Sequence, residues 1–202
     1  MYILFGLVAV VIVSLMVAGT RRMLERTSLK QANTEIRAAL AGNPAEVHRR
    51  MADLGTRLCQ ANPRQAMATI QASRSVFSRH VAPVLIGLLG HPSEAVAQVA
   101  VAALNDLGSP GLRAAWEARQ GDSVRSRRIS AFLEAHPDWL FERLLTSFVQ
   151  EGPASVQAHR SWWSTDGMQQ RLQVLADTAD AVNRERVKTI RDALTPSSDH
   201  VA

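Results

Sequence analysis

An apolar N-terminal run and a series of amphipathic segments divide the chain. Residues 2–19 carry no charged side chain, and a helix of that length extends about 27 Å, enough to cross the hydrocarbon core of a bilayer. Arg21 and Arg22 follow at once, so the positive-inside rule places the N-terminus outside and the remaining chain in the cytoplasm. Because no basic residue precedes the run, we predict a single-pass helix of a bacterial inner membrane rather than a cleaved signal peptide.

Beyond this run, apolar residues recur every three or four positions, as in helices with one buried face. Val47, Met51, Leu54 and Leu58 are an example, and Gly, Pro and Asn punctuate the segments. The predicted helices cover residues 20–41, 44–60, 63–72, 80–89, 94–107, 112–119, 124–135, 138–149, 154–163 and 166–194. No stretch shows sustained period-two alternation, so the predicted fold class is all-α without a sheet.

One segment has a more specific pattern. Leu85, Leu88 and Leu89 lie on a first predicted helix, Pro92 marks a turn, and a second helix carries Val96, Val99, Ala100, Ala103 and Leu104. This pattern resembles a HEAT-type repeat of the short bacterial variety, with a looser match over residues 124–149. Ala97 stands where the family often has an arginine, so the family's Asp/Arg ladder is largely missing. The resemblance, over about 76–149, implies a short HEAT-like α-solenoid, with an irregular bundle of helical hairpins as the alternative.

The expected organisation has four parts. A transmembrane anchor covers residues 1–20, a basic juxtamembrane helix 21–42, a helical-repeat domain 43–194 and a flexible tail 195–202. The net charge of the 202-residue chain is +5, and much of the excess lies just after the apolar run. Four basic residues there are expected to face lipid headgroups: Arg21, Arg22, Arg26 and Lys30. Since no basic stripe crosses the rest of the chain, we expect no nucleic-acid partner.

The sequence offers no recognisable catalytic motif. It lacks a glycine-rich phosphate loop, His-Glu-x-x-His, a Cys-x-x-Cys pair and Gly-x-Ser-x-Gly. The six histidines are scattered, and Cys59 follows two apolar positions, which favours a buried thiol. We therefore predict no catalytic residue, no cofactor, no metal site and no small-molecule substrate.

The tripeptide His136-Pro137-Asp138 resembles the signature of J-domain co-chaperones and follows a basic helix. In that family the tripeptide lies in an open loop, whereas here an apolar helix begins immediately after it. Proline at the first position of a helix and an acidic residue in its first turn are common helix-start features. We favour this structural interpretation.

Two sets of residues are candidates for binding a partner protein. Trp162 and Trp163 are adjacent, so we expect one to face the core and the other to be exposed or half-exposed, as an interface anchor or as a lid on the last repeat. The second set is Arg125, Arg127 and Arg128, with Arg119. These arginines either form a docking face or bond one repeat to its neighbour. The final predicted helix breaks its apolar register at Arg186, which indicates a second contact, within the chain or with a partner helix.

These observations favour a scaffold or accessory subunit of a bacterial membrane complex, acting by protein–protein interaction. The anchor would contact lipid through residues 2–19, and other subunits of the complex would be its partners. Two alternatives stay open. HEAT-like proteins include lyases and chaperones that act on pigment or cofactor proteins, which would require a cleft holding His80 or His91 beside a carboxylate, and the tripeptide allows a J-like co-chaperone.

Overall fold

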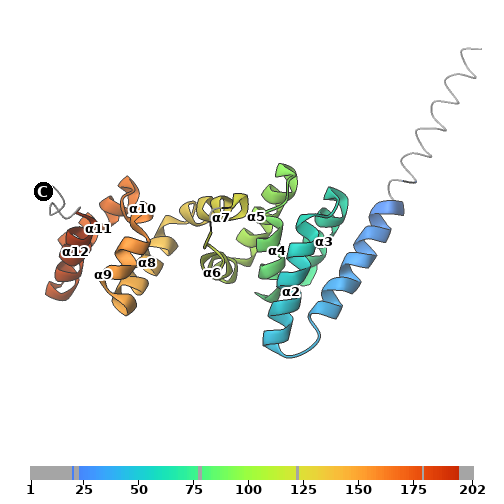
Figure 1. Ribbon diagram of the computed structural model, residues 1–202, viewed down its shortest axis with the longest axis horizontal. Helices are drawn as coiled ribbons and strands as arrows, with labels where there is room; N and C mark the ends of the chain where they lie inside the picture. Colours follow the sequence, from blue (N-terminus) through green and yellow to red (C-terminus); the bar gives the residue numbers. More distant parts are fainter. Residues whose placement is uncertain (1–19, 21–22, 77–78, 122, 179, 196–202) are drawn as a thin grey trace, which may run out of the picture. The chain divides into compact units, whose positions relative to one another are not determined.

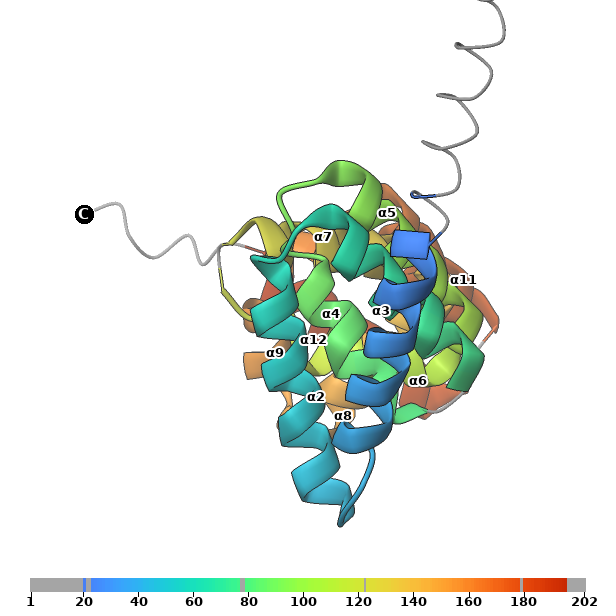
Figure 2. The ribbon, with the colours of Figure 1, turned by 90° about the vertical axis from the view of Figure 1, so that its right-hand side faces the viewer.

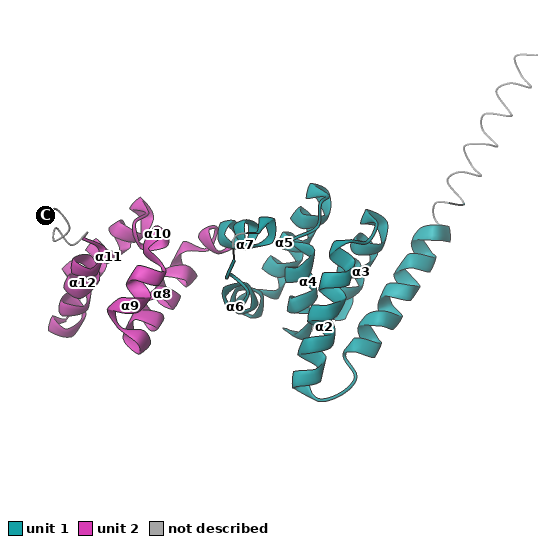
Figure 3. Cartoon of the chain, viewed as in Figure 1, with its two compact units in different colours: residues 1–132 teal, residues 133–202 magenta. Residues whose placement is uncertain are grey.

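A computed structural model describes residues 20, 23–76, 79–121, 123–178 and 180–195. Within these ranges the chain is helical and contains no strand, as the sequence predicted. The chain divides into two compact units, residues 1–132 and 133–202 (Figure 3). This division falls inside the segment for which the sequence predicted one helical-repeat domain. Each unit is described by itself.

In the described part of unit 1, the first helix with continuous bounds covers residues 23–39. The unit continues with α2 (Pro44–Cys59), α3 (Pro63–Val76), the short 3₁₀ helix η1 (Arg79–Val81), α4 (Ala82–Leu88), α5 (Glu94–Leu107) and α6 (Ser109–Glu117) (Figure 1). The division between the units falls within α7 (Val124–Glu134). In unit 2 follow α8 (Pro137–Glu151), α9 (Pro153–Ala158), α10 (Arg160–Trp163), α11 (Asp166–Thr178) and α12 (Ala181–Leu194).

Local sequence determines where these helices begin. The Asn43 side chain accepts a hydrogen bond of 3.0 Å from the Glu46 backbone N–H, and Pro44 occupies the first turn of α2. The Asn62 side chain caps α3 in the same way, 3.0 Å from the Gln65 N–H. Each cap satisfies a backbone donor that the helix itself cannot pair. The repeated Asn-Pro pair thus marks two helix starts, as the sequence indicated.

The core of unit 1 is built around the pairing of α2 with α4, which lie side by side in both ribbon views (Figures 1 and 2). The helices cross where Gly55 of α2 meets Gly87 of α4. A Cβ atom on Gly87 would lie 2.6 Å from the Cα of Gly55, closer than any ordinary carbon contact. The two backbones therefore approach this closely because neither residue has a side chain.

Apolar side chains pack along this crossing from both helices. Met51 and Leu58 of α2 are buried, as are Leu85 and Leu88 of α4. α5 in turn packs against α3 and α4, and α6 against α4 and α5. The pairing of α4 with α5 matches the helical hairpin predicted for residues 80–107. The HEAT-like assignment itself stays a prediction.

In unit 2, α8 packs against α9 and α11, while α12 packs against α9 and α11. The single final helix predicted for 166–194 is wrong, because two helices, α11 and α12, occupy this range. Asp180 begins α12, and its side chain accepts a hydrogen bond from the Asn183 N–H at 2.9 Å. Such a cap starts a new helix and allows the chain to reverse, so α11 and α12 form a hairpin. The predicted helix 154–163 is likewise divided into α9 and α10.

The expectation of a membrane-spanning helix requires correction. Among the residues that the structure describes, no helix is both long enough and apolar enough to cross a bilayer. These helices are amphipathic, with polar residues on one side, whereas a spanning helix needs about 20 predominantly apolar residues. This finding contradicts the predicted transmembrane fold class and the predicted inner-membrane location. Residues 2–19, to which the prediction assigned the helix, and the predicted tail beyond residue 195 lie outside the described residues.

Candidate functional site

A large hollow in unit 1 lies between the start of helix 23–39, α3 and the start of α5. We call it the α3 groove, and its volume is about 680 Å³. Its apolar lining comes from all three helices: Leu24, Pro63, Met67, Ala68, Ile70, Ala95, Val96 and Val99. Leu24 and Met67 are 56% and 37% exposed, which is high for large apolar side chains. An apolar concave surface of this kind is typical of sites that bind a ligand or another protein.

Charged side chains line the same groove. Arg64 is exposed, and among the described residues it makes no hydrogen bond or ion pair through its side chain. Arg74 instead pairs with Asp106 of α5, with 2.6 Å between the guanidinium and the carboxylate. Glu25 completes the charged lining from helix 23–39. The described residues of the groove therefore offer an apolar floor and, at Arg64, a cation that none of them pairs.

Sequence reasoning missed this groove. It ended the third helix at about residue 72 and singled out neither Leu24 nor Met67. The one available signal was that Leu24 and Met67 are large apolar residues at positions where the helical pattern is imperfect. Only the packing of α3 and α5 beside helix 23–39 brings them to the same surface.

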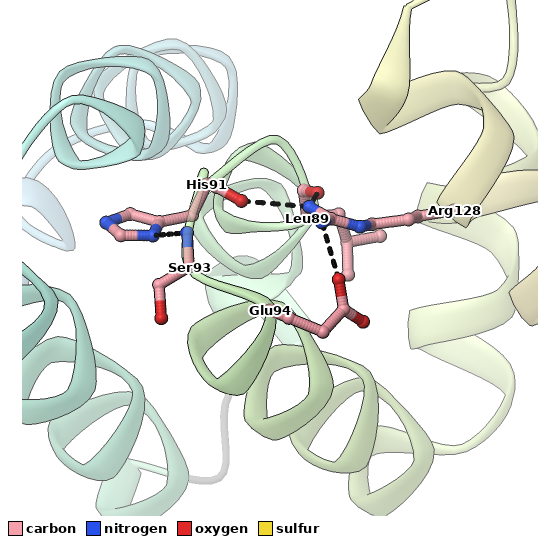
Figure 4. Close-up of polar contacts among 5 residues, drawn as sticks. All are labelled: Leu89, His91, Ser93, Glu94 and Arg128. Carbon is pink, nitrogen blue, oxygen red and sulfur yellow. Dashed lines mark hydrogen bonds and ion pairs between the residues drawn. The ribbon is translucent and has the colours of Figure 1, made fainter.

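The predicted arginine face is divided between two roles. Arg128 of α7 donates from one guanidinium nitrogen to the carbonyls of Leu89 and His91, at 2.7 and 2.9 Å. Its other terminal nitrogen pairs with Glu94 at 2.7 Å (Figure 4). Arg128 thus ties α7 to the turn between α4 and α5, which is the structural alternative considered from the sequence.

The other arginines of this set differ from Arg128. Arg125 and Arg127 are exposed, and no side-chain bond of either is found among the described residues. Arg119 lies over the ring of Trp116, 3.8 Å from its centroid, and donates to the Trp116 carbonyl. Only Arg125 and Arg127 therefore remain available to a partner.

Both members of the tryptophan pair are buried, so the expectation that one would be exposed is wrong. α10 has only four residues, and the two rings reach different surroundings from it. Trp163 meets the ring of Phe141 edge-on at 6.1 Å between centroids. Trp162 stacks on His159 at 5.6 Å and donates from Nε1 to Glu134 at 3.1 Å. Neither tryptophan is an exposed interface anchor in this chain.

The tripeptide at 136–138 starts a helix, as the structural interpretation predicted. His136 is the N-cap residue of α8, and Pro137 occupies its first turn. The Asp138 carboxylate pairs with Arg171 of α11 at 2.7 Å. The acidic residue of the tripeptide therefore joins two helices of unit 2.

His91 is fully engaged in local structure. The ring is buried, its Nε2 lies 3.0 Å from the Ala61 carbonyl, and its Nδ1 accepts from the Ser93 N–H at 2.9 Å (Figure 4). This pattern requires a proton on Nε2 and none on Nδ1. The ring therefore joins the turn after α2 to the turn after α4, and among the described residues neither ring nitrogen bonds to a carboxylate. Cys59 is a free thiol of intermediate exposure.

Of the residues predicted to face lipid, Arg26 and Lys30 are exposed on helix 23–39, and Arg21 and Arg22 lie outside the described residues. Within the described ranges, no group of three or more His, Cys, Asp or Glu side chains is arranged to hold a metal ion.

Comparisons with models of protein families, with curated protein sequences and with solved structures found no match to this chain.

Proposed function

We propose that this chain is a helical scaffold or accessory subunit that acts by binding another protein, and that the α3 groove is its docking site. The observation that carries the proposal is the apolar groove of about 680 Å³ with Leu24 and Met67 exposed on its surface. Leaving large apolar side chains in water costs free energy that a bound partner would recover.

The partner we propose is an amphipathic helix of another protein. Such a helix places apolar residues three and four positions apart into a groove between helices, which is a recurring mode of recognition. Arg64 lines the groove without an intramolecular partner among the described residues, so it complements an acidic side chain beside the apolar stripe of that helix. α5 forms one wall of the α3 groove. The pairing of α5 with α4 in a hairpin, interpreted as a HEAT-like unit, would hold that wall in place.

The proposal is tested by placing a photo-crosslinking amino acid at residue 67 in cells of the source organism. The matched control carries the same amino acid at Val149, which is 56% exposed on α8 in unit 2. We expect a specific adduct from position 67 and none from position 149. Mass spectrometry of the adduct should identify a peptide with apolar residues at helical spacing and an adjacent Asp or Glu.

Charge exchange then tests the role of Arg64. Arg64→Glu should weaken binding of the identified peptide about three- to tenfold, the effect of losing one favourable charge pair of modest strength. A Lys in place of the peptide's acidic residue should restore binding to the Arg64→Glu variant. Equal crosslinking at positions 67 and 149, or an adduct peptide without an apolar helical stripe, would overturn the proposal.

A further inference from the structure

A second, smaller cavity in unit 1 lies between the end of α3, η1, α4 and α5. Its volume is about 360 Å³, and we call it the Ser73 pocket. The apolar walls come from η1, α4 and α5: Val81, Leu85, Ala103 and Leu107. Among the described residues, the polar ones that line it are Ser73, Arg74 and Asp106.

The Ser73 hydroxyl is the unusual feature of this pocket. Ser73 is fully buried, and among the described residues its Oγ has no hydrogen-bond partner. Hydroxyl groups in a helix commonly donate to a carbonyl three or four residues earlier. Two neighbours in α3 do so: Thr69 donates to the Gln65 carbonyl at 3.0 Å, and Ser75 to the Ala72 carbonyl at 2.7 Å. Ser73 departs from this pattern in the same helix.

A buried hydroxyl without a partner is unfavourable, because it has lost its hydrogen bonds to water and gained none in return. Ser73 is one of the residues that line the cavity. A molecule in the cavity could therefore supply the missing hydrogen bond. The half-exposed ion pair of Arg74 with Asp106 also lines the cavity, so the pocket has a charged and solvated side as well as an apolar one.

We propose that the Ser73 pocket binds a small, mainly apolar, uncharged molecule that carries one hydroxyl or carbonyl group. The apolar body would lie against Val81, Leu85 and Leu107, and its polar group would bond to the Ser73 Oγ. The volume falls within the range of small-molecule sites, about 300–1,000 Å³. An apolar cavity of about 150 Å³ engineered in another protein holds benzene, so a two-ring molecule is a suitable probe here. This proposal is independent of the docking function proposed above.

The experiment compares two probes that differ by one hydroxyl group. Binding of 2-naphthol and of naphthalene to the purified full chain would be measured by titration calorimetry or ligand fluorescence. We expect 2-naphthol to bind more tightly by roughly three- to tenfold, the contribution of one neutral hydrogen bond. In Ser73→Ala, 2-naphthol should lose this advantage, while naphthalene should bind as before.

Two further variants make the result specific. Thr69→Val removes a buried hydroxyl from the same helix, but that hydroxyl is already bonded to the backbone and does not line the pocket. It should leave the preference for 2-naphthol unchanged. Ala103→Leu adds three carbons to the pocket wall and should weaken binding of both probes, with circular dichroism confirming that the helices remain.

Three results would overturn the inference. The first is that neither probe binds the unaltered chain. The second is equal binding of the two probes, which would indicate that the Ser73 hydroxyl is satisfied by water alone. The third is a preference for 2-naphthol that persists in Ser73→Ala, which would place the polar contact elsewhere.

Discussion

The contact between Gly55 and Gly87 leads to a sharp prediction for Gly87→Ala. The added Cβ would lie 2.6 Å from both the Cα and the carbonyl carbon of Gly55 and 2.9 Å from its oxygen. Carbon atoms in contact are normally about 3.5–4.0 Å apart. The opposing atoms belong to the backbone, so no side chain can rotate away, and α2 must move from α4 by about 1 Å.

The cost of that movement can be estimated. Overpacking of a core costs about 1–3 kcal/mol, and occasionally more. Separating the helices also weakens the contacts of Met51, Leu58, Leu85 and Leu88, because a gap of about 1 Å loses up to half of each dispersion contact. Alanine in place of glycine inside a helix returns about 1 kcal/mol. Since the clash is with backbone, we expect Gly87→Ala to lower the free energy of unfolding of unit 1 by about 2 kcal/mol.

Urea denaturation followed by circular dichroism at a helical wavelength measures this change. A matched series should rank the variants by the space around each glycine. Gly55→Ala should cost less than Gly87→Ala, because its Cβ would meet the backbone of α4 at 3.0 Å. Gly167→Ala in α11 should be neutral or slightly stabilising, because its Cβ would meet only the flexible end of Arg171, at 3.6 Å. A Gly87→Ala protein as stable as the unaltered chain would refute the reasoning, as would a reversed ranking.

Three further substitutions should destabilise the chain through identified hydrogen bonds. Arg128→Lys cannot reproduce the two carbonyl bonds and the ion pair of the guanidinium (Figure 4), and it should cost about 1–2 kcal/mol in urea denaturation. His91→Phe preserves the ring shape but leaves a backbone carbonyl and a backbone N–H without their partners, and the same assay should show a loss of about 2 kcal/mol or more. Asp180→Ala removes the cap of α12 and should cost about 1 kcal/mol, which thermal unfolding of the chain would detect.

Each of these substitutions has its own check. Arg127→Lys is the control for Arg128, since Arg127 is exposed and no side-chain bond of it is found among the described residues. Equal losses for the two arginines would contradict the structural role of Arg128. A His91→Phe protein with an unchanged free energy of unfolding would mean that the turns after α2 and α4 stay together without the imidazole ring. For Asp180, Asp180→Asn should retain most of the stability, because asparagine also caps helices.

The starts of several helices could be predicted from the sequence alone. The starts of α2 and α3 follow from Asn-Pro pairs, because the amide side chain caps the helix and proline suits its first turn. The start of α8 follows from Pro137, which suits the first turn, although the N-cap residue His136 makes no capping hydrogen bond through its side chain. Interactions between residues close in the chain determine these features, so they can be deduced without knowing the fold.

Predictions that depended on distant contacts were less successful. The sequence pattern could not show that the helix predicted for 166–194 is two helices, because the break in its apolar register at Arg186 is compatible with either one helix that makes two contacts or a hairpin. It also could not show that Trp162 and Trp163 are both buried. That outcome depends on α10 having only four residues and on the positions of Phe141 and Glu134.

The sequence by itself determined an all-α chain, most helix starts, and the burial of the apolar faces of α2, α4 and α5, because helical periodicity and capping are local properties. Only the tertiary structure decided that Gly55 and Gly87 allow two backbones to touch, that Arg128 is an internal tie, and that Leu24 and Met67 share a groove. The Ser73 pocket, too, was decided only by the tertiary structure. A cavity is the space left by several helices packed together, and no single segment of sequence encodes that space.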